Sequence, residues 1–434
     1  METLRIALVS DWYMPRRGGV ETAIYNLAKT LRDHGHDPIV VTHQNRVLRD
    51  PPLVSYDDGI PVVRFKLPLR GDDYTISPKA AKLLYKFLKY NGVDLVHGHS
   101  VLSPFANMAV HVGKGILGIP TVLTHHSLIS SELRVWHSIL LKYGVYRADE
   151  LTAVSKAAGR DLEEIVPARK VRVTPNCMDI RGWRSVEALE LEGDPVLLYV
   201  ARLIPRKNPF LALKAYEGVV KEKPSASLYI VGGGSLEREI KEYVERKGLR
   251  RAVLVGPVDR RMVGGYMAGS DLFLATGRRE AFSLASLEAM ALGLPVVGFS
   301  GTGVEDLVTD GFNGFLASTE TEFIEKARIL SLDDDLRLMF SRRSLLASER
   351  YDCNNVYPRY LEVYRSALEK CSREKRFLLY RLYRLVRMDP VKPGEWCEYR
   401  RECYEGLQAE KGGIPYIRRR AGRSTIPVSE QSRY

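Results

Sequence analysis

The sequence lacks several features that mark familiar classes of protein. It has no window of about 18 uninterrupted apolar residues, so no membrane-spanning helix is expected. The apolar run at residues 4–9 contains Arg5 and stops before Asp11, which is too short for an export signal. The five cysteines are widely spaced without a Cys-x-x-Cys pair. Neither a disulfide framework nor a zinc site is therefore expected, and a reduced, cytoplasmic setting is favoured.

Acidic residues are also in the minority. The chain has 65 Lys and Arg against 53 Asp and Glu, a net charge of +12. Residues 371–434 hold 15 basic and 8 acidic residues and so carry +7 of that surplus. A basic tail favours an acidic partner, either anionic membrane lipid or nucleic acid. Tyrosines interleave with the basic residues of the tail, so nucleic acid stays open there. For the rest of the chain nucleic acid is not favoured.

What the chain does contain is a regular alternation of short apolar segments with amphipathic helical patterns. Near-continuous apolar strands between helices are typical of a parallel sheet that is buried on both faces. The rhythm lapses over residues 183–193 and restarts, which predicts two doubly wound, Rossmann-like α/β domains facing a central cleft. The expected strands are residues 4–10, 38–42, 62–65, 95–97, 121–123, 151–154 and 171–174, then 196–201, 227–231, 253–255, 272–275 and 295–299.

The same rhythm predicts the domain boundaries. Residues 1–175 are expected to form the amino-terminal domain, 176–193 a linker and 194–350 the carboxy-terminal domain. Residues 351–370 have the pattern of an amphipathic helix, and 371–434 form the basic tail.

Two clusters follow predicted strand ends, where doubly wound domains bind ligands. Gly18 and Gly19 lie at a turn before a helical pattern, and a helix start offers free N–H groups to an anion. A tight turn that needs glycine only for its dihedral angles is the alternative. Arg202 and Lys207 follow the first strand of the second half. Two fixed cations suit a diphosphate, although a solvated basic loop is the commoner reason for such a cluster.

Glu280 and Glu288 lie at the two ends of a stretch that leads into a predicted helix. Carboxylates accept hydrogen bonds from sugar and ribose hydroxyls, and this separation suits two ends of one extended ligand. Helix-dipole complementarity for Glu280 and a surface position for Glu288 are the alternatives. Glu288 is followed by Ala-Met-Ala-Leu-Gly, however, which predicts a buried helix, and a buried carboxylate needs a partner.

Four motifs in this order resemble those of the retaining glycosyltransferases of the family 4 type. They are Pro-x-x-Gly-Gly-x-Glu at 15–21, Thr-x-His at 124–126, Arg-x4-Lys at 202–207, and Glu-x7-Glu at 280–288 ahead of Ala-Met-Ala-x-Gly-x-Pro-Val-Val. The resemblance spans roughly residues 4–370. Residues 9–21, 124–128 and 280–282 are especially similar to the phosphatidylinositol N-acetylglucosaminyltransferase branch of the family.

The resemblance implies a GT-B architecture, with the acceptor on the amino-terminal domain and the nucleotide sugar on the carboxy-terminal one. It further implies retaining transfer of N-acetylglucosamine or another hexose, with a UDP-sugar as donor, no metal and no cofactor. No predicted strand ends in Asp-x-Asp, which agrees with a metal-independent reaction. The residues carried over are Gly18, Gly19, Arg202 and Lys207 for the donor diphosphate, Glu288 for the ribose, His126 and Glu280 for catalysis beside the donor sugar, and Ala281, Phe282, Ser283 and Leu284 for the donor-sugar loop.

The sequence departs from the family pattern in two loops. Ala281 and Ser283 replace the glycines of Glu-Gly-Phe-Gly, so sugar identity is not carried over through them. Gly303 with Glu305 and Asp306 replaces Gly-Gly-x-Pro-Glu, which leaves the role of that loop open.

Three weaker signals have competing interpretations. His97 and His99 are able to bind a metal, but the resemblance favours a cleft wall. The run Val231-Gly-Gly-Gly lacks the third glycine of a dinucleotide loop and favours a tight turn. His125 stands beside His126, and the spacing from Thr124 selects His126.

The acceptor is predicted less directly. Residues 79–90 form a basic amphipathic pattern that suits an anionic membrane surface, although a helix docked on its own domain explains it slightly better. Residues 128–146 add Trp136 and further apolar side chains. With the basic tail, these features favour a lipid or lipid-linked acceptor and a peripheral position on the cytoplasmic face of a membrane. A soluble sugar or polysaccharide acceptor, and an epimerase or hydrolase on the same scaffold, remain alternatives.

Overall fold

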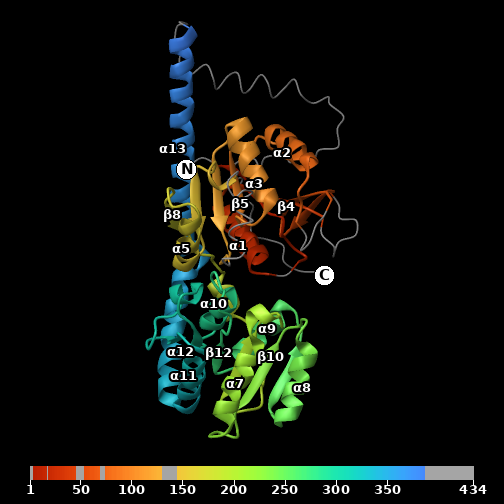
Figure 1. Ribbon diagram of the computed structural model, residues 1–434, viewed down its shortest axis with the longest axis vertical. Helices are drawn as coiled ribbons and strands as arrows, with labels where there is room; N and C mark the ends of the chain where they lie inside the picture. Colours follow the sequence, from red (N-terminus) through yellow and green to blue (C-terminus); the bar gives the residue numbers. More distant parts are fainter. Residues whose placement is uncertain (1–2, 17, 45–52, 69–73, 130–143, 387–434) are drawn as a thin grey trace, which may run out of the picture.

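A computed structural model describes residues 3–16, 18–44, 53–68, 74–129 and 144–386, with the backbone alone over 375–386. The chain folds into two α/β domains, and the long helix α13 lies against the amino-terminal one (Figure 1). The predicted fold class is confirmed. No helix in these ranges is long and apolar enough to cross a membrane.

The amino-terminal domain is built on an eight-stranded sheet with the order β3-β4-β2-β1-β5-β6-β7-β8. Every neighbouring pair is parallel except β3 with β4. The central strands are buried along their whole length, as their apolar composition predicts. The strands are β1 (Arg5–Val9), β2 (Asp37–His43), β3 (Val54–Asp57), β4 (Ile60–Phe65), β5 (Leu95–His99), β6 (Thr121–His125), β7 (Glu150–Ala153) and β8 (Val171–Val173).

Helices connect these strands and cover the sheet. Helix α1 buries Ile24, Leu27 and Leu31, whose spacing of three and four residues puts them on one face. Helix α3 is extended by the π-helical segment η1 (His111–Leu117). The helices of this domain are α1 (Gly19–Asp33), α2 (Pro78–Tyr90), α3 (Pro104–Val110) and α5 (Lys156–Ile165).

The carboxy-terminal domain has a six-stranded parallel sheet with the order β11-β10-β9-β12-β13-β14. Its strands are β9 (Val196–Val200), β10 (Ser227–Val231), β11 (Ala252–Gly256), β12 (Leu272–Leu274), β13 (Val296–Phe299) and β14 (Gly314–Ala317). Its helices are α7 (Pro209–Val220), α8 (Glu237–Lys247), α9 (Arg260–Ala268), α10 (Leu284–Ala291), α11 (Glu320–Leu332) and α12 (Asp334–Ser348), with short 3-10 turns η2 (Pro205–Lys207), η3 (Gly303–Asp306) and η4 (Glu349–Tyr351).

The sequence pattern does not predict two of these strands. β3 is an edge strand whose residues are half-buried or exposed, so it has no continuous apolar run. β14 is only four residues long and begins with a glycine. Edge strands pair on one side only, and their composition therefore carries a weaker signal than that of central strands.

The chain crosses between the domains twice, and the two crossovers are paired. Met178 donates its N–H to the carbonyl of Tyr351, and Cys353 donates to the carbonyl of Met178. A disulfide joins Cys177 to Cys353. The expectation that the cysteines form no disulfide is therefore wrong for this pair. The two residues are 176 positions apart, and only the meeting of the crossovers brings them together.

Helix α13 (Cys353–Val386) returns the chain to the amino-terminal domain after helix α6 (Ile180–Arg184) has led it away. It begins near the position predicted but continues well past Lys370, where the predicted helix ends. Val356, Tyr360 and Tyr364 are buried against β1, β5 and α1 in one hydrophobic cluster. Figure 1 shows α13 running along this domain and projecting beyond it.

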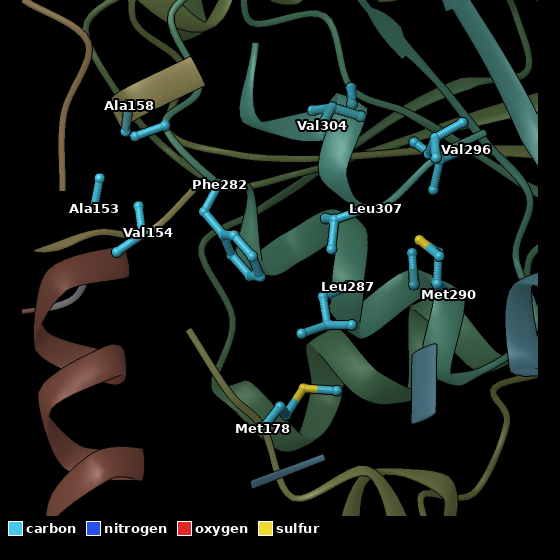
Figure 2. Close-up of a cluster of buried hydrophobic side chains, with 14 of the residues drawn as sticks. Ala153, Val154, Ala158, Met178, Phe282, Leu287, Met290, Val296, Val304 and Leu307 are labelled. Carbon is cyan, nitrogen blue, oxygen red and sulfur yellow. The ribbon is translucent and has the colours of Figure 1, made fainter. Parts of the chain in front are cut away.

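A second hydrophobic cluster spans both domains. It joins Val154 and Ala158 of the amino-terminal domain to Phe282, Leu287 and Leu307 of the other. Figure 2 shows Phe282 directed into this group, with Met178 of the first crossover at its edge. The loop that holds Glu280 is therefore anchored by an apolar side chain at the junction of the domains.

Candidate functional site

The predicted site residues lie just beyond the carboxyl ends of strands in both sheets. Gly18 and Gly19 follow β1, His126 follows β6, Arg202 follows β9, and Glu280 follows β12. Parallel strands place such residues at one edge of their sheet. The electrostatic effect of Arg202 on the carboxyl of Glu21 in α1 indicates that the two sheet edges are near one another.

The glycine pair opens α1, and its two members have different surroundings. Gly18 is the N-cap residue with an extended backbone, and a Cβ placed there would lie 2.5 Å from Oε2 of Glu21. A Cβ on Gly19 would meet no atom of the described residues within 4 Å. Packing within the protein therefore explains Gly18. Gly19 leaves open space beside the free N–H groups of the helix start, which suits an anion.

Glu21 belongs to the same motif but had no predicted role. Its side chain is buried and pairs with Arg16, Nε to Oε1 at 3.3 Å. Burial raises the pKa of its carboxyl, and the charges of Arg16 and Arg202 act against that shift. Glu21 therefore lies close enough to Arg202 of the other domain for that charge to act on its carboxyl.

Three histidines form a cluster behind the end of β6. His126 is half-buried, and its Nε2 lies 3.1 Å from Nδ1 of His99. His97 packs against His99 with 4.1 Å between ring centroids and the rings tilted by 31°. Burial lowers the pKa of His97 and of His126 to about 3 and that of His99 well below its ordinary value. All three imidazoles are therefore neutral near pH 7.

His125 and His126 point to different partners. The Nε2 atom of His125 lies 3.0 Å from Asp161 on α5, and the ring is fully buried. His97 bonds the hydroxyls of Tyr364 and Thr124, so both of its nitrogens are occupied by protein groups. The described residues contain no group of three His, Cys, Asp or Glu side chains able to hold a metal.

The loop after β9 brings Lys207 to Glu280. The Nζ of Lys207 lies 2.5 Å from Oε1 of Glu280, and both side chains are largely buried. Thr276 and Tyr199 donate hydroxyl hydrogen bonds to the carbonyl of Lys207 and fix its backbone. Arg202 is exposed on the same loop. The family resemblance assigns Lys207 to the donor diphosphate and Glu280 to the donor sugar. In the structure the two side chains form an ion pair with one another.

The glycine run after β10 supports this loop from behind. Gly232 has a φ of +135°, and a Cβ there would lie 2.0 Å from the carbonyl oxygen of Ala201. A Cβ on Gly234 would lie 2.4 Å from the carbonyl oxygen of Leu203. These glycines are needed for close packing against the loop that carries Arg202.

The donor-sugar loop, residues 281–284, is held by packing and by one unusual backbone conformation. Ala281 and Phe282 are buried, and the Phe282 ring meets Tyr351 edge-on at 5.6 Å. Ser283 has a φ of +68°, a conformation that favours glycine. Its hydroxyl accepts the N–H of Ser286 and caps α10, whose first residue is Leu284. This explains why glycine fits that position of the family motif.

The loop that departs from the family pattern supports Glu280 and joins the domains. Gly303 donates its N–H to the carbonyl of Glu280, and a Cβ there would lie 2.1 Å from the carbonyl oxygen of Ala281. Asp306 accepts the N–H of Lys156 at 2.8 Å, and Glu305 lies 3.5 Å from Arg160. Both of these partners are on α5 of the amino-terminal domain.

Glu288 has the partner that its burial requires. Its side chain is 13% exposed and lies 3.0 Å from Arg260, the first residue of α9. Burial raises the pKa of Glu288, against the charge of Arg260. The Arg260 guanidinium also lies over the ring of Trp183, whose Nε1 donates to the carbonyl of Glu288. Arg260 and Trp183 carry no motif that would have revealed them.

Two family models match adjacent stretches of the chain. The model described as Glycosyltransferase Family 4 matches residues 17–181, and that described as Glycosyl transferases group 1 matches residues 183–345. Their matches include all the motifs on which the resemblance rests apart from the first residues of the first loop.

Two curated proteins illustrate the relationship. The chain is 22% identical over 403 residues to the GPI3 subunit of phosphatidylinositol N-acetylglucosaminyltransferase of Saccharomyces cerevisiae, covering 89% of this chain and 88% of that protein. It is 27% identical over 374 residues to phosphatidyl-myo-inositol mannosyltransferase of Mycolicibacterium smegmatis, covering 83% and 93%.

The fold is shared with solved glycosyltransferase structures. HepE of Anabaena, in complex with UDP and glucose, matches with a TM-score of 0.65 at 20% identity, covering 83% of this chain and 98% of that one. The family resemblance is thus confirmed by both sequence and fold. The chain is a glycosyltransferase of the family 4 type, with two Rossmann-like domains in the GT-B arrangement.

Proposed function

We propose that this protein transfers a hexose, with N-acetylglucosamine as the first candidate, from a UDP-sugar to a lipid or lipid-linked acceptor with retention of anomeric configuration. The observation that carries the proposal is the Lys207–Glu280 pair, which lies on the loops with the exposed Arg202, whose charge acts on Glu21 in the first turn of α1. Cations, helix-end N–H groups and a carboxylate are what a nucleotide diphosphate sugar needs.

The donor diphosphate is assigned to the Gly18 and Gly19 amides with Arg202 and Lys207. Lys207 would exchange part of its contact with Glu280 for a phosphate oxygen, which leaves the carboxylate to accept hydroxyl hydrogen bonds from the sugar. Glu288 would accept the ribose hydroxyls. The presence of UDP in the HepE complex supports a uridine nucleotide.

The proposed transfer reaction uses these assigned groups. The bond between the anomeric carbon and the phosphate oxygen breaks, and the acceptor hydroxyl attacks from the same face. Its proton passes to the departing phosphate oxygen. Arg202 and Lys207 stabilise the negative charge that grows on the diphosphate, and no metal is assigned a step. His126, neutral at pH 7, would lie beside the donor sugar.

A lipid acceptor is supported by the names of two relatives, which act on phosphatidylinositol. Helix α2 also bears on this question. Its apolar residues Leu84, Phe87 and Leu88 are buried in the amino-terminal domain, so they are not available for insertion into a bilayer. Lys79, Lys82 and Lys89 are exposed. Contact with a membrane through α2 would thus be electrostatic. Trp136 and the basic tail from residue 387 lie outside the described residues.

Thermal-shift measurements with UDP, GDP, UDP-N-acetylglucosamine and GDP-mannose test the donor, because a ligand that binds the native state raises its stability. Arg202→Ala should weaken the response to UDP by about 1.5–3 kcal/mol, the value of a charged hydrogen bond. Exposed Arg238 on α8 offers a matched control, and Arg238→Ala should respond like the wild type. A response to no nucleotide would overturn the proposed donor.

Transfer from UDP-N-acetylglucosamine to phosphatidylinositol vesicles tests the acceptor. Labelled glycolipid is the expected product. Sugar released only into water would indicate a hydrolase, and transfer only to soluble glycans would exclude the lipid. Flotation with anionic vesicles at low and high salt tests membrane contact, which should weaken as salt screens the lysines.

A further inference from the structure

Among the described residues, the cluster of His97, His99 and His126 contains one buried ring nitrogen with no hydrogen-bond partner. Nε2 of His99 is buried and unpaired, whereas its Nδ1 lies 3.1 Å from Nε2 of His126. The Nδ1 atom of His126 has no hydrogen-bond partner among the described residues and is not one of the buried unpaired atoms. It is the nitrogen that His126 has left for a ligand.

The unpaired Nε2 of His99 indicates which ring nitrogens of His99 and His126 carry the N–H protons. A neutral imidazole has one N–H donor and one bare nitrogen acceptor. A buried N–H without an acceptor is the rarer and costlier defect, so the unpaired Nε2 of His99 is favoured as the bare nitrogen. The proton of His99 is then on Nδ1, which donates to Nε2 of His126. His126 must carry its own proton on Nδ1.

We propose that His99 is a positioning residue that fixes the tautomer of His126, so that His126 presents an Nδ1–H donor, and not a base, to the donor sugar. The inference rests on the proposed function for the sugar contact, although the tautomer itself does not. An N–H donor at this place would hold a hydroxyl or carbonyl oxygen of the sugar. It leaves the acceptor proton to the departing phosphate.

The surroundings of His99 hold its ring in place. The tilted ring of His97 packs against it, and His97 is itself held by hydrogen bonds to Tyr364 at 2.9 Å and Thr124 at 2.6 Å. Thr124 continues to Thr152 at 2.5 Å. Tyr364 lies on α13, so the returning helix stabilises the residue behind the site. The ring of His99 is thus packed against a histidine that two hydrogen bonds hold in place.

Nitrogen-15 spectra of histidine-labelled protein test the tautomer directly. The chain has nine histidines, and the His126 signals are assigned from their loss in His126→Gln. We expect Nδ1 of His126 to be protonated and Nε2 to be bare in the full-length protein. A protonated Nε2 on His126 would overturn the proposal. This measurement needs no substrate, so it stands even if the proposed reaction is wrong.

Two substitutions of His99 test the functional consequence. Asparagine keeps an N–H donor near the position of Nδ1, and leucine removes it. In transfer from UDP-N-acetylglucosamine to phosphatidylinositol vesicles, His99→Leu should lower kcat about tenfold with little change in KM, the effect of one hydrogen bond. His99→Asn should recover most of kcat.

A matched control is His36→Leu, which removes another buried histidine that contacts Tyr357 on α13. Its kcat should equal that of the wild type, with melting temperatures recorded for every variant. Equal kcat in His99→Leu and His99→Asn would refute a role for the donor bond. If His126→Ala keeps the wild-type rate, the proposed function of His126 fails, while the spectra still decide the tautomer.

Discussion

The two sides of the domain junction hold their polar side chains in different ways. On the amino-terminal side, His126, His99 and His97 are neutral, with His99 hydrogen-bonded to His126 and packed against His97. On the carboxy-terminal side, Glu280 and Glu288 are each paired with a cation, Lys207 and Arg260. The first group needs no rearrangement before a ligand arrives. Under the proposed function, Lys207 and Glu280 would bind different parts of the donor, so their ion pair would have to open.

The largest effect on the transfer rate is expected from removing the charge of Glu280 on the carboxy-terminal side. Glu280→Gln removes the carboxylate that would bind the sugar and frees Lys207. We expect transfer to fall about 100-fold or more, since a fixed electrostatic contact beside the reacting centre contributes on that scale. Initial rates of glycolipid formation measure it, and a melting temperature verifies folding. Glu305→Gln, at the domain contact, is the matched control. A wild-type rate in Glu280→Gln would remove Glu280 from the site.

The neutral histidines of the amino-terminal side should affect how the free energy of unfolding depends on pH. The pKa of His126 is lowered from 6.5 to about 3, so below pH 6.5 the unfolded chain binds a proton that the folded protein does not. The free energy of unfolding should therefore fall as the pH drops from 6.5 toward 3, by up to about 1.4 kcal/mol per pH unit for this group.

Denaturant unfolding of the wild type and of His126→Gln between pH 7 and 5 isolates this contribution. The raised pKa values of Glu21 and Glu288 act in the opposite direction, because the folded protein binds those protons more tightly. The difference between the two proteins is therefore the quantity to compare. Parallel curves would mean that His126 is not held neutral by burial.

The glycine pair at the start of α1 separates packing from ligand binding. Gly18→Ala should lower stability by about 1–2 kcal/mol, because its Cβ displaces the buried Glu21 carboxylate. Gly19→Ala should change stability by less than about 0.5 kcal/mol while weakening the thermal shift with UDP. A similar loss of stability in both variants would contradict the distinction between them.

A small net effect on stability is also expected in the donor-sugar loop. Ser283→Gly relieves a left-handed backbone but loses the side-chain cap of α10 and adds freedom to the unfolded chain. The net gain in stability should stay below about 1 kcal/mol, and Ser286→Gly, which has no such backbone, should be destabilising. Chemical denaturation of the two variants compares them. A loss in Ser283→Gly would show that the cap outweighs the backbone.

Elements with a local sequence signal were predictable. Apolar blocks predicted the central strands, because a strand covered on both faces needs apolar residues along its whole length. The edge strands β3 and β14 were not predicted, because half-exposed strands lack a continuous apolar run. Helix α2 shows the limit of amphipathic patterns. Its lysines and leucines fit either a membrane or a domain, and only the packing of Leu84 and Phe87 shows that the apolar face is buried.

By itself, the sequence determined two Rossmann-like domains, the family, and which residues follow the strand ends. The tertiary structure decided their partners. It paired Lys207 with Glu280 and Arg260 with Glu288, placed His99 behind His126, and joined Cys177 to Cys353. The reason is physical. Strand and helix signals depend on neighbours along the chain, whereas a buried charge or ring nitrogen takes whichever partner the packing of distant segments brings within hydrogen-bond distance.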